Sequence, residues 1–240
     1  MVTLPAAGAY HSRPVSANQV LALAQSECKL AALPRRLVRH LAGAPSYCAA
    51  VSLKVRPAGA DRWDDVAAVL GRRGDPSRCW CQYFRLRGKQ WSEADPDSRR
   101  AALRSQVVDA EIPPGVLAED EDGTPVGWCA LAPRASYPRV VASPNWRHDG
   151  HDPGAWAVTC FVVPVGHRRR GVAGELLLGA VEFARSQGAR TLEGCAVDLA
   201  EAGRVPSADL YRGPLSVFLA AGFEEISRTS PTWVLVRRSL

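Results

Sequence analysis

The chain has 240 residues, of which 47% are apolar, and a formal net charge of +6 at pH 7. This length usually gives one large domain or two small ones, with enough buried surface to fold without disulfides. The seven cysteines lack the spacing of a secreted disulfide scaffold. No apolar run approaches the roughly 18 residues of a membrane span. Because the N-terminus also lacks a signal-peptide layout, we expect a cytoplasmic protein without a membrane partner.

The first fifty residues differ from the rest in charge and periodicity. Residues 1–50 carry five basic side chains against one acid, Glu27, and Pro34 interrupts the helical spacing there. We expect residues 1–50 to form a largely disordered N-terminal extension before one domain over residues 51–240. A targeting presequence, which is also Arg-rich and acid-poor, is an alternative. Nucleic-acid binding is not favoured, because no aromatic residues are interleaved with the basic ones.

The domain begins with a strand and a helix. Alternation of apolar and charged residues predicts a strand over 52–58. Helical spacing then predicts a helix over 61–71, with Asp61 as its N-cap and Gly71 as its C-cap.

A second helix and a hairpin follow. Asp95 is a suitable N-cap, and Pro96 suits the first position of a helix. Two apolar runs flank Asp122-Gly123, a strong turn signal, so residues 115–133 are predicted to form a hairpin.

The second half continues to alternate strands with helices. The elements predicted here are a strand over 156–163, a helix over 171–188, a strand over 191–197, a helix over 214–221 and strands over 223–228 and 232–238. The first of these strands is apolar on both faces, as a central strand is. The long helix has a buried stripe of Leu177, Val181 and Ala184. Together the elements predict a mixed α/β sheet with helices on its faces.

A short basic turn joins the central strand to the long helix. It reads HRRRGVAG from His167 to Gly174, so three arginines precede a run of small residues. The first turn of a helix has free N–H groups and the positive end of the helix dipole, and Gly171, Ala173 and Gly174 would leave them accessible. The pattern favours an anion site, although it is neither a P-loop nor a dinucleotide fingerprint. The alternative is a solvated basic turn before a closely packed helix.

At these residues the chain resembles the GNAT superfamily, the general-control-related N-acetyltransferases. The superfamily signature is Arg or Gln, two residues, Gly, one residue, then Gly or Ala, and Arg168, Gly171 and Ala173 match it. The stretch VFLAAGFEEISR looks like the family's closing helix and strand, and residues 53–238 follow its element order. The segments CWCQYFRL and GWCALAPR resemble a bacterial subgroup whose substrates are unassigned.

The resemblance implies a fold, a donor and a reaction. The fold is a mixed, mostly antiparallel sheet with helices on both faces. The donor is acetyl-CoA, used without a metal, and the acceptor is an amine. The pyrophosphate would bind the N–H groups after the signature Arg. The pantetheine arm would pair with the central strand, in a cleft between this strand and strand 191–197. Pro164 would end the pairing, because proline has no N–H to donate. The residues implied in donor binding are Phe161, Val162, Val163, Arg168, Arg169, Arg170, Gly171, Val172, Ala173 and Gly174.

The reaction also requires a base that takes a proton from the amine. Asp152 and His151 are candidates, because the strand they precede leads to the expected acyl site; a plain polar loop is the alternative. Glu193, on the facing strand, is another candidate, and its alternative is a surface acid at a sheet edge. Cys160 could carry the acyl group, but a small residue packed in a strand is the favoured interpretation.

The proton donor is where the chain departs from the family pattern. GNAT enzymes often carry a Tyr four residues before the Gly of the closing Gly-Phe, and here that position is Phe218. Tyr211 is the nearest phenol. Pro214 suits the first helical position, so Tyr211 is expected in the loop before the helix. It could protonate the leaving thiolate, hydrogen-bond the pantetheine, or pack on the surface without a role.

Two other groups of residues carry side chains that often occur in functional sites. Cys79 and Cys81 form a C-x-C pair without a second pair, so no metal site is predicted. Trp128 and Tyr137, near Arg134, could line a substrate pocket or belong to the core.

Three functions therefore compete. The leading one is an acyl-CoA-dependent N-acetyltransferase that acts on a primary amine by direct attack on the thioester. The second is a non-catalytic acyl-CoA-binding module with a regulatory or scaffolding role. The third is a protein that binds nucleic acid or another partner through its basic tail, which the signature disfavours. The sequence determines neither the amine nor the oligomeric state.

Overall fold

The computed structural model describes residues 53–150, 152–202, 205 and 209–240. The chain divides into two units, residues 1–50 and residues 51–240. The first unit, and with it our expectation of an extension or a presequence, lies outside the described residues. Within the described part, no helix combines the length and the apolar character that a membrane crossing requires.

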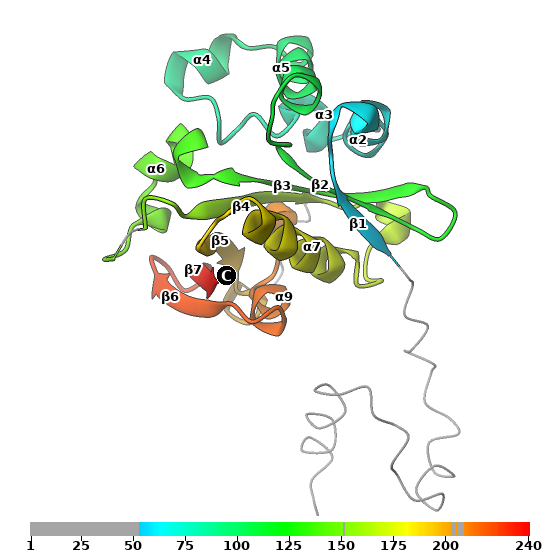
Figure 1. Ribbon diagram of the computed structural model, residues 1–240. Helices are drawn as coiled ribbons and strands as arrows, with labels where there is room; N and C mark the ends of the chain where they lie inside the picture. The colour runs from blue at the N-terminus through cyan, green and yellow to red at the C-terminus, as the bar shows by residue number, and fades with distance from the viewer. Residues whose placement is uncertain (1–52, 151, 203–204, 206–208) are drawn as a thin grey trace, which may run out of the picture. The chain divides into compact units, whose positions relative to one another are not determined.

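One sheet of seven strands forms the centre of the second unit, in the order β1-β2-β3-β4-β5-β7-β6 (Figure 1). Its strands are β1 (Lys54–Pro57), β2 (Gly115–Glu119), β3 (Pro125–Pro133), β4 (Trp156–Val162), β5 (Thr191–Val197), β6 (Glu224–Arg228) and β7 (Trp233–Ser239). Every neighbouring pair is antiparallel except β4 and β5, which run parallel. The expected mixed, mostly antiparallel sheet is confirmed.

Helices cover both faces of this sheet. They are α2 (Trp63–Leu70), α3 (Asp75–Cys79), α4 (Gly88–Glu93), α5 (Pro96–Val108), α6 (Pro138–Ala142), α7 (Val172–Ser186), α8 (Leu199–Ala202) and α9 (Leu215–Ala220). α7 and α9 pack on one face, and α2, α3 and α5 lie on the other (Figure 1). The predicted strands and helices are all present with small shifts at their ends, whereas α3, α4, α6 and α8 were not predicted.

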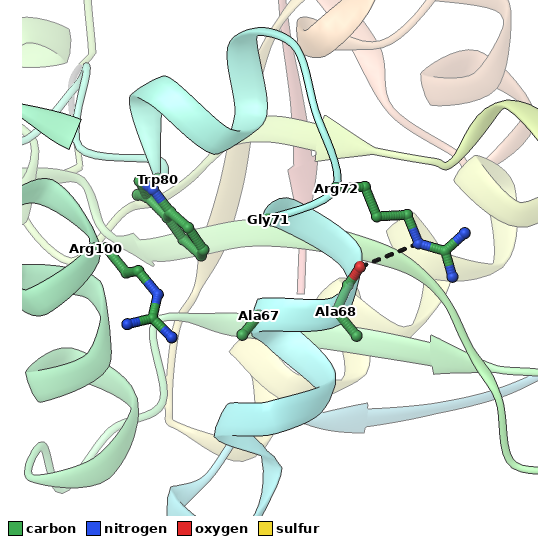
Figure 2. Close-up of a pocket in the computed structure, with 6 residues that line it drawn as sticks. All are labelled: Ala67, Ala68, Gly71, Arg72, Trp80 and Arg100. Atoms are coloured by element: carbon green, nitrogen blue, oxygen red, sulfur yellow. Dashed lines mark hydrogen bonds between the residues drawn. The ribbon is translucent and has the colours of Figure 1, made fainter. Parts of the chain in front are cut away.

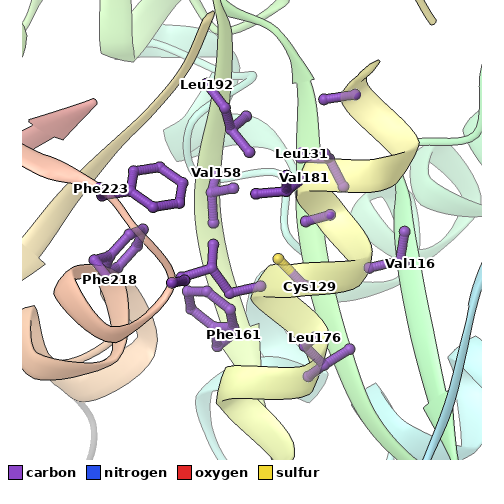
Figure 3. Packing of buried hydrophobic residues seen from close by; sticks show 14 of the residues in the cluster. Val116, Cys129, Leu131, Val158, Phe161, Leu176, Val181, Leu192, Phe218 and Phe223 are labelled. Carbon is purple, nitrogen blue, oxygen red and sulfur yellow. The ribbon is translucent and has the colours of Figure 1, made fainter. Parts of the chain in front are cut away.

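The face under α7 holds the largest continuous core. The predicted stripe of Leu177, Val181 and Ala184 is buried, as expected. Figure 3 shows Val181 of α7 beside the strands, with Phe161 of β4 and Phe218 of α9 in the same cluster. Phe218, the position where the family often carries a Tyr, is therefore a core residue.

The start of α7 lies directly on β3, because Gly127 has no side chain. A Cβ at Gly127 would lie 2.7 Å from Cγ1 of Val172 and 2.9 Å from Cδ1 of Leu176. The next residue, Trp128, pairs with Val162 at the end of β4. This close approach holds the first turn of α7 near the end of β4.

Two of the three predicted helix caps are confirmed. Oδ1 of Asp95 accepts a 2.7 Å hydrogen bond from the N–H of Ser98 in the first turn of α5. Gly71 ends α2, and its N–H donates back into the helix. The cap predicted at Asp61 is wrong, because Asp61 lies in a 3-10 turn and α2 begins only at Trp63, without a side-chain cap. The turn places Asp61 too early to reach the first N–H groups of the helix.

Candidate functional site

β4 and β5 separate part-way along their length. They pair at Trp156–Leu192, Ala157–Glu193 and Val158–Gly194. Beyond these pairs, β4 continues beside β3 and β5 continues beside β7. Among the described residues, no strand lies between the final part of β4 and the final part of β5. We call this interruption of the sheet the β4–β5 split, and it is the opening expected between these two strands.

A β-bulge in β4 coincides with the start of the split. Ala130 pairs with Cys160 and the next residue, Leu131, pairs with Val158, so Thr159 is an extra residue on β4. A bulge bends its strand and increases the local twist. Since Val158 is also the last residue that pairs with β5, the bend at Thr159 turns the end of β4 away from β5.

The turn between β4 and α7 exposes a set of backbone N–H groups. Gly171 is the N-cap of α7 with φ +81°, and Arg169 has φ +58°. The carbonyl of Gly171 accepts from the N–H groups of Gly174 and Glu175. Within the described residues, the N–H groups of residues 169–173 have no backbone acceptor. Free N–H groups in such a turn, at the positive end of a helix, form a concave site for an anion.

The same turn leaves room for a ligand. A Cβ added at Gly166, Gly171 or Gly174 would meet no atom within 4 Å. The side chains of Arg168, Arg169 and Arg170 are exposed around this space. The residues present therefore fit a phosphate-bearing group in both space and charge.

Arg168 also has a local structural partner. Its Nε donates a 2.9 Å hydrogen bond to the carbonyl of Val163, just after β4. The signature arginine thus fastens the turn to the end of the strand. One of its donors is used for this purpose, and the rest of the guanidinium remains exposed.

The segment before α9 packs against both strands beyond the split. The N–H of Val197 on β5 donates to the carbonyl of Gly213, at 3.0 Å. A Cβ at Gly213 would lie 3.0 Å from the ring of Phe161 on β4, so glycine allows the close contact. This segment carries Tyr211 in a 3-10 turn over Asp209–Arg212, before Pro214, as predicted.

The phenol of Tyr211 is half-buried on the face of the sheet opposite α7, where it joins the cluster that contains Phe84. Its oxygen accepts a 3.0 Å hydrogen bond from Nε of Arg212. Burial raises the pKa of Tyr211, Arg212 opposes the shift, and Tyr83 and Cys160 raise it slightly further. The 3-10 turn that carries Tyr211 contacts both β4 and β5.

Asp152 lies at the other end of β4. Its carboxylate accepts from the N–H of Gly154 at 2.9 Å, from Nη2 of Arg190 at 2.8 Å and from the hydroxyl of Thr191 at 3.1 Å. The Gly154 hydrogen bond is the largest cause that lowers the pKa of Asp152. The carboxylate therefore joins the loop before β4 to the start of β5. The second candidate in this loop, His151, lies outside the described residues.

Glu193 is completely buried, so the alternative of a surface acid at a sheet edge is wrong. Its carboxylate oxygens lie 3.3 Å from Nε of Arg134, 2.9 Å from Nε2 of His148 and 2.9 Å from Nη2 of Arg237. Glu193 pairs with Ala157, in the part of the sheet where β4 and β5 are still joined. The structure does not bring Asp152 or Glu193 next to Tyr211.

Trp128 and Tyr137 belong to the core, which decides between the two interpretations of these residues. The indole N–H of Trp128 donates to Sγ of Cys81 at 3.2 Å.

Contact with Cys81 and burial raise the pKa of Cys160 well above its usual range, which agrees with a packed thiol. Among the described residues, no three His, Cys, Asp or Glu side chains are grouped to hold a metal.

A surface hollow of about 370 Å³ lies on the α2 side of the molecule, away from the split (Figure 2). Its lining residues are Ala67, Ala68, Gly71, Arg72, Trp80 and Arg100. The guanidinium of Arg100 lies 5.6 Å from the ring centre of Trp80. None of these residues belongs to β4, β5 or the turn before α7.

Sequence reasoning missed Arg212, which contacts both Tyr211 and the aromatic cluster. The available signal was an arginine next to the candidate phenol, in the sequence YRGP.

The model of the acetyltransferase (GNAT) family matches residues 80–212, which include β4, the basic turn and α7. A GCN5-related N-acetyltransferase from Kribbella flavida is 17% identical, with a TM-score of 0.44 over 79% of this chain and 98% of that chain. An acetyltransferase from Thermus thermophilus is 18% identical, with a TM-score of 0.43 over 80% of this chain and 99% of that chain. No curated protein sequence matches the chain.

Proposed function

This chain belongs to the acetyltransferase (GNAT) family, and on that premise we propose that it moves the acetyl group of acetyl-CoA to a primary amine. The observation that carries the proposal is the β4–β5 split, whose β4 side leads directly into the open, arginine-flanked N-terminus of α7. A strand with a free edge and an anion site are the two features that a long phosphorylated donor requires.

The donor would lie along these two features. The free N–H groups of residues 169–173 and the exposed arginines would bind the pyrophosphate. The pantetheine arm would follow Phe161 to Val163 as an added strand, and Pro164, which has no N–H, would end the pairing. The thioester would then lie within the split, close to Cys160 and Tyr211.

The chemistry needs one bond made, one bond broken and two protons moved. The neutral amine attacks the thioester carbonyl, and the developing oxyanion would be stabilised by a backbone N–H of residues 161–163. The C–S bond breaks, the amine nitrogen loses a proton, and the thiolate gains one. Tyr211 would supply the proton that the thiolate gains. Its raised pKa keeps the phenol protonated, and the hydrogen bond from Arg212 is accepted by the phenol oxygen, so the hydroxyl hydrogen stays available for donation.

Among the described residues, neither of the two carboxylates that are candidate proton acceptors, Asp152 and Glu193, lies beside the split. Asp152 and Glu193 stay predictions for this role, and each is held by basic partners at the joined end of β4 and β5. This placement is the observation that favours a second candidate function, a non-catalytic module that binds acyl-CoA. A water molecule in the split that accepts the proton would serve the enzyme equally well.

Release of free thiol from acetyl-CoA, measured with a panel of primary amines, separates the two functions. We expect amine-dependent thiol release and an acetylated amine that mass spectrometry identifies. Binding of acetyl-CoA without thiol release from any amine would contradict the enzyme and support the module.

A further inference from the structure

Arg212 has an unusual environment beside the split. Its guanidinium carbon lies 4.5 Å from the ring centre of Trp233 and 5.3 Å from those of Phe84 and Tyr211. Its Nε donates to Tyr211, but its Nη1 is buried without a hydrogen-bond partner. Within the described residues, no carboxylate forms an ion pair with Arg212.

Neighbouring arginines on the same face use their donors differently. Nε of Arg139 donates to the carbonyls of Tyr83 and Leu86, and both Nη atoms of Arg99 donate to backbone carbonyls. These two side chains hold loops together, although Nε of Arg99, like Nη1 of Arg212, is buried without a hydrogen-bond partner. Arg212 makes no such bond to the backbone among the described residues, although a guanidinium has five N–H donors to satisfy. A buried donor without an acceptor is costly unless a ligand supplies the acceptor.

The position of Arg212 relates it to the reacting group. The turn that carries it packs against β4 and β5, and the N–H of Val197 holds the following glycine. Arg212 interacts with Cys195, the first residue of β5 beyond the split, while Tyr211 interacts with Cys160 of β4. The guanidinium and the phenol therefore face the split together, from the side opposite α7.

We propose that Arg212 binds a carboxylate of the acceptor, so that the substrate is an amino acid or another small amine with a nearby carboxylate. The inference rests on the proposed acetyl transfer. A planar guanidinium binds a carboxylate through two parallel hydrogen bonds, which would orient the attached amine. Because Arg212 adjoins the phenol that would protonate the sulfur, only a few bonds can separate the carboxylate from the amine. The rings of Phe84 and Trp233 would surround an apolar side chain.

Pairs of substrates that differ in one charge test the inference. For amino acids and their amides, we expect kcat/KM of the native protein to favour the acid by about 10–100-fold, as for a hydrogen bond to a charged group. Arg212→Gln should remove most of this preference, and Arg212→Lys should retain part of it. Because the readout is a ratio within one protein, a general loss of folding cancels. Arg185→Gln, which removes an exposed arginine of α7, should leave the ratio unchanged.

The outcomes also distinguish a failure of the proposed role of Arg212 from a failure of the proposed acetyl transfer. Acetylation of polyamines, lysine peptides or amino acid amides at least as fast as of amino acids would overturn the role of Arg212 and leave acetyl transfer intact. Absence of thiol release with every amine would overturn both. An unchanged ratio of acid to amide in Arg212→Gln would overturn the role of Arg212 even if amino acids are the substrates.

Discussion

Nε of Arg212 donates a hydrogen bond of 3.0 Å to the phenol oxygen of Tyr211. The bond joins a side chain with an unused N–H to a phenol on the turn that packs against β4 and β5. It leaves the hydroxyl hydrogen of Tyr211 free to point toward another acceptor. One local contact thus connects the proposed acceptor site with the proposed proton donor.

Tyr211→Phe should lower kcat by about ten- to a hundredfold with little change in acetyl-CoA affinity, an estimate at or below the usual range for general acid catalysis. Because burial raises the pKa of Tyr211 from its usual value, kcat should not fall through loss of this proton near neutral pH. Steady-state kinetics and calorimetric binding check both statements. Tyr83→Phe, which removes a neighbouring phenol oxygen, is the matched control. Equal kcat in native protein and Tyr211→Phe would leave solvent as the proton donor.

Glu193→Gln should destabilise the fold by about 3–5 kcal/mol, because it removes the negative charge from a buried group of ion pairs. Arg134, His148 and Arg237 would each lose their carboxylate. Denaturant unfolding measures the change. The control Glu182→Gln breaks an exposed pair with Arg185 and should cost about 0–1 kcal/mol. A stable Glu193→Gln protein with greatly reduced kcat would instead support Glu193 as the base.

Asp152→Asn should weaken the hydrogen bonds that connect the loop before β4 to the start of β5. The hydrogen bonds from Gly154 and Arg190 lower the pKa of the folded carboxylate, so its stabilisation is present above the unfolded pKa. This stabilisation is lost as the pH falls through the lower, folded pKa. Thermal melting of the native protein and Asp152→Asn should therefore differ at pH 7 and converge in acid. A normal melting temperature with lost activity would favour the catalytic role of Asp152.

Elements whose signals are local could be predicted from the sequence. The helix α5 has its cap at Asp95, and α7 has its apolar stripe and its glycine N-cap within the same stretch of chain. The short helices α3 and α6 were missed because contacts from distant residues stabilise them. An example is Arg139 in α6, which donates to the carbonyl of Tyr83, more than fifty residues earlier.

The candidate site was predictable only in part, for the same reason. The basic turn is contiguous, so its small residues and arginines could be recognised together. The split depends on a bulge at Thr159, which becomes visible only when β3 pairs with β4. The burial of Glu193 could not be predicted, because its partners His148 and Arg237 lie far away in the sequence. The aromatic partners of Arg212 come from Phe84 and Trp233, which are equally remote.

That residues 1–50 are dispensable for folding stays a prediction. Composition and Pro34 argue that residues 1–50 contribute no packed core. A chain that starts at Val51 should melt within a few degrees of the full chain, as differential scanning calorimetry would measure. A large fall in melting temperature or solubility would show that the first fifty residues stabilise the domain.

The central claim is that the first turn of α7 holds the phosphates of the acyl donor. Gly174→Glu places a carboxylate in this turn, and Gly174→Gln places an uncharged side chain of the same shape there. The space around Gly174 is open, and an acid in the first turn favours the helix, so both proteins should fold. Calorimetric titration with coenzyme A should give a Kd roughly 10–100-fold weaker for Gly174→Glu than for Gly174→Gln, as expected for like charges a few ångströms apart. Equal affinities for the two proteins would contradict the claim and place the donor elsewhere.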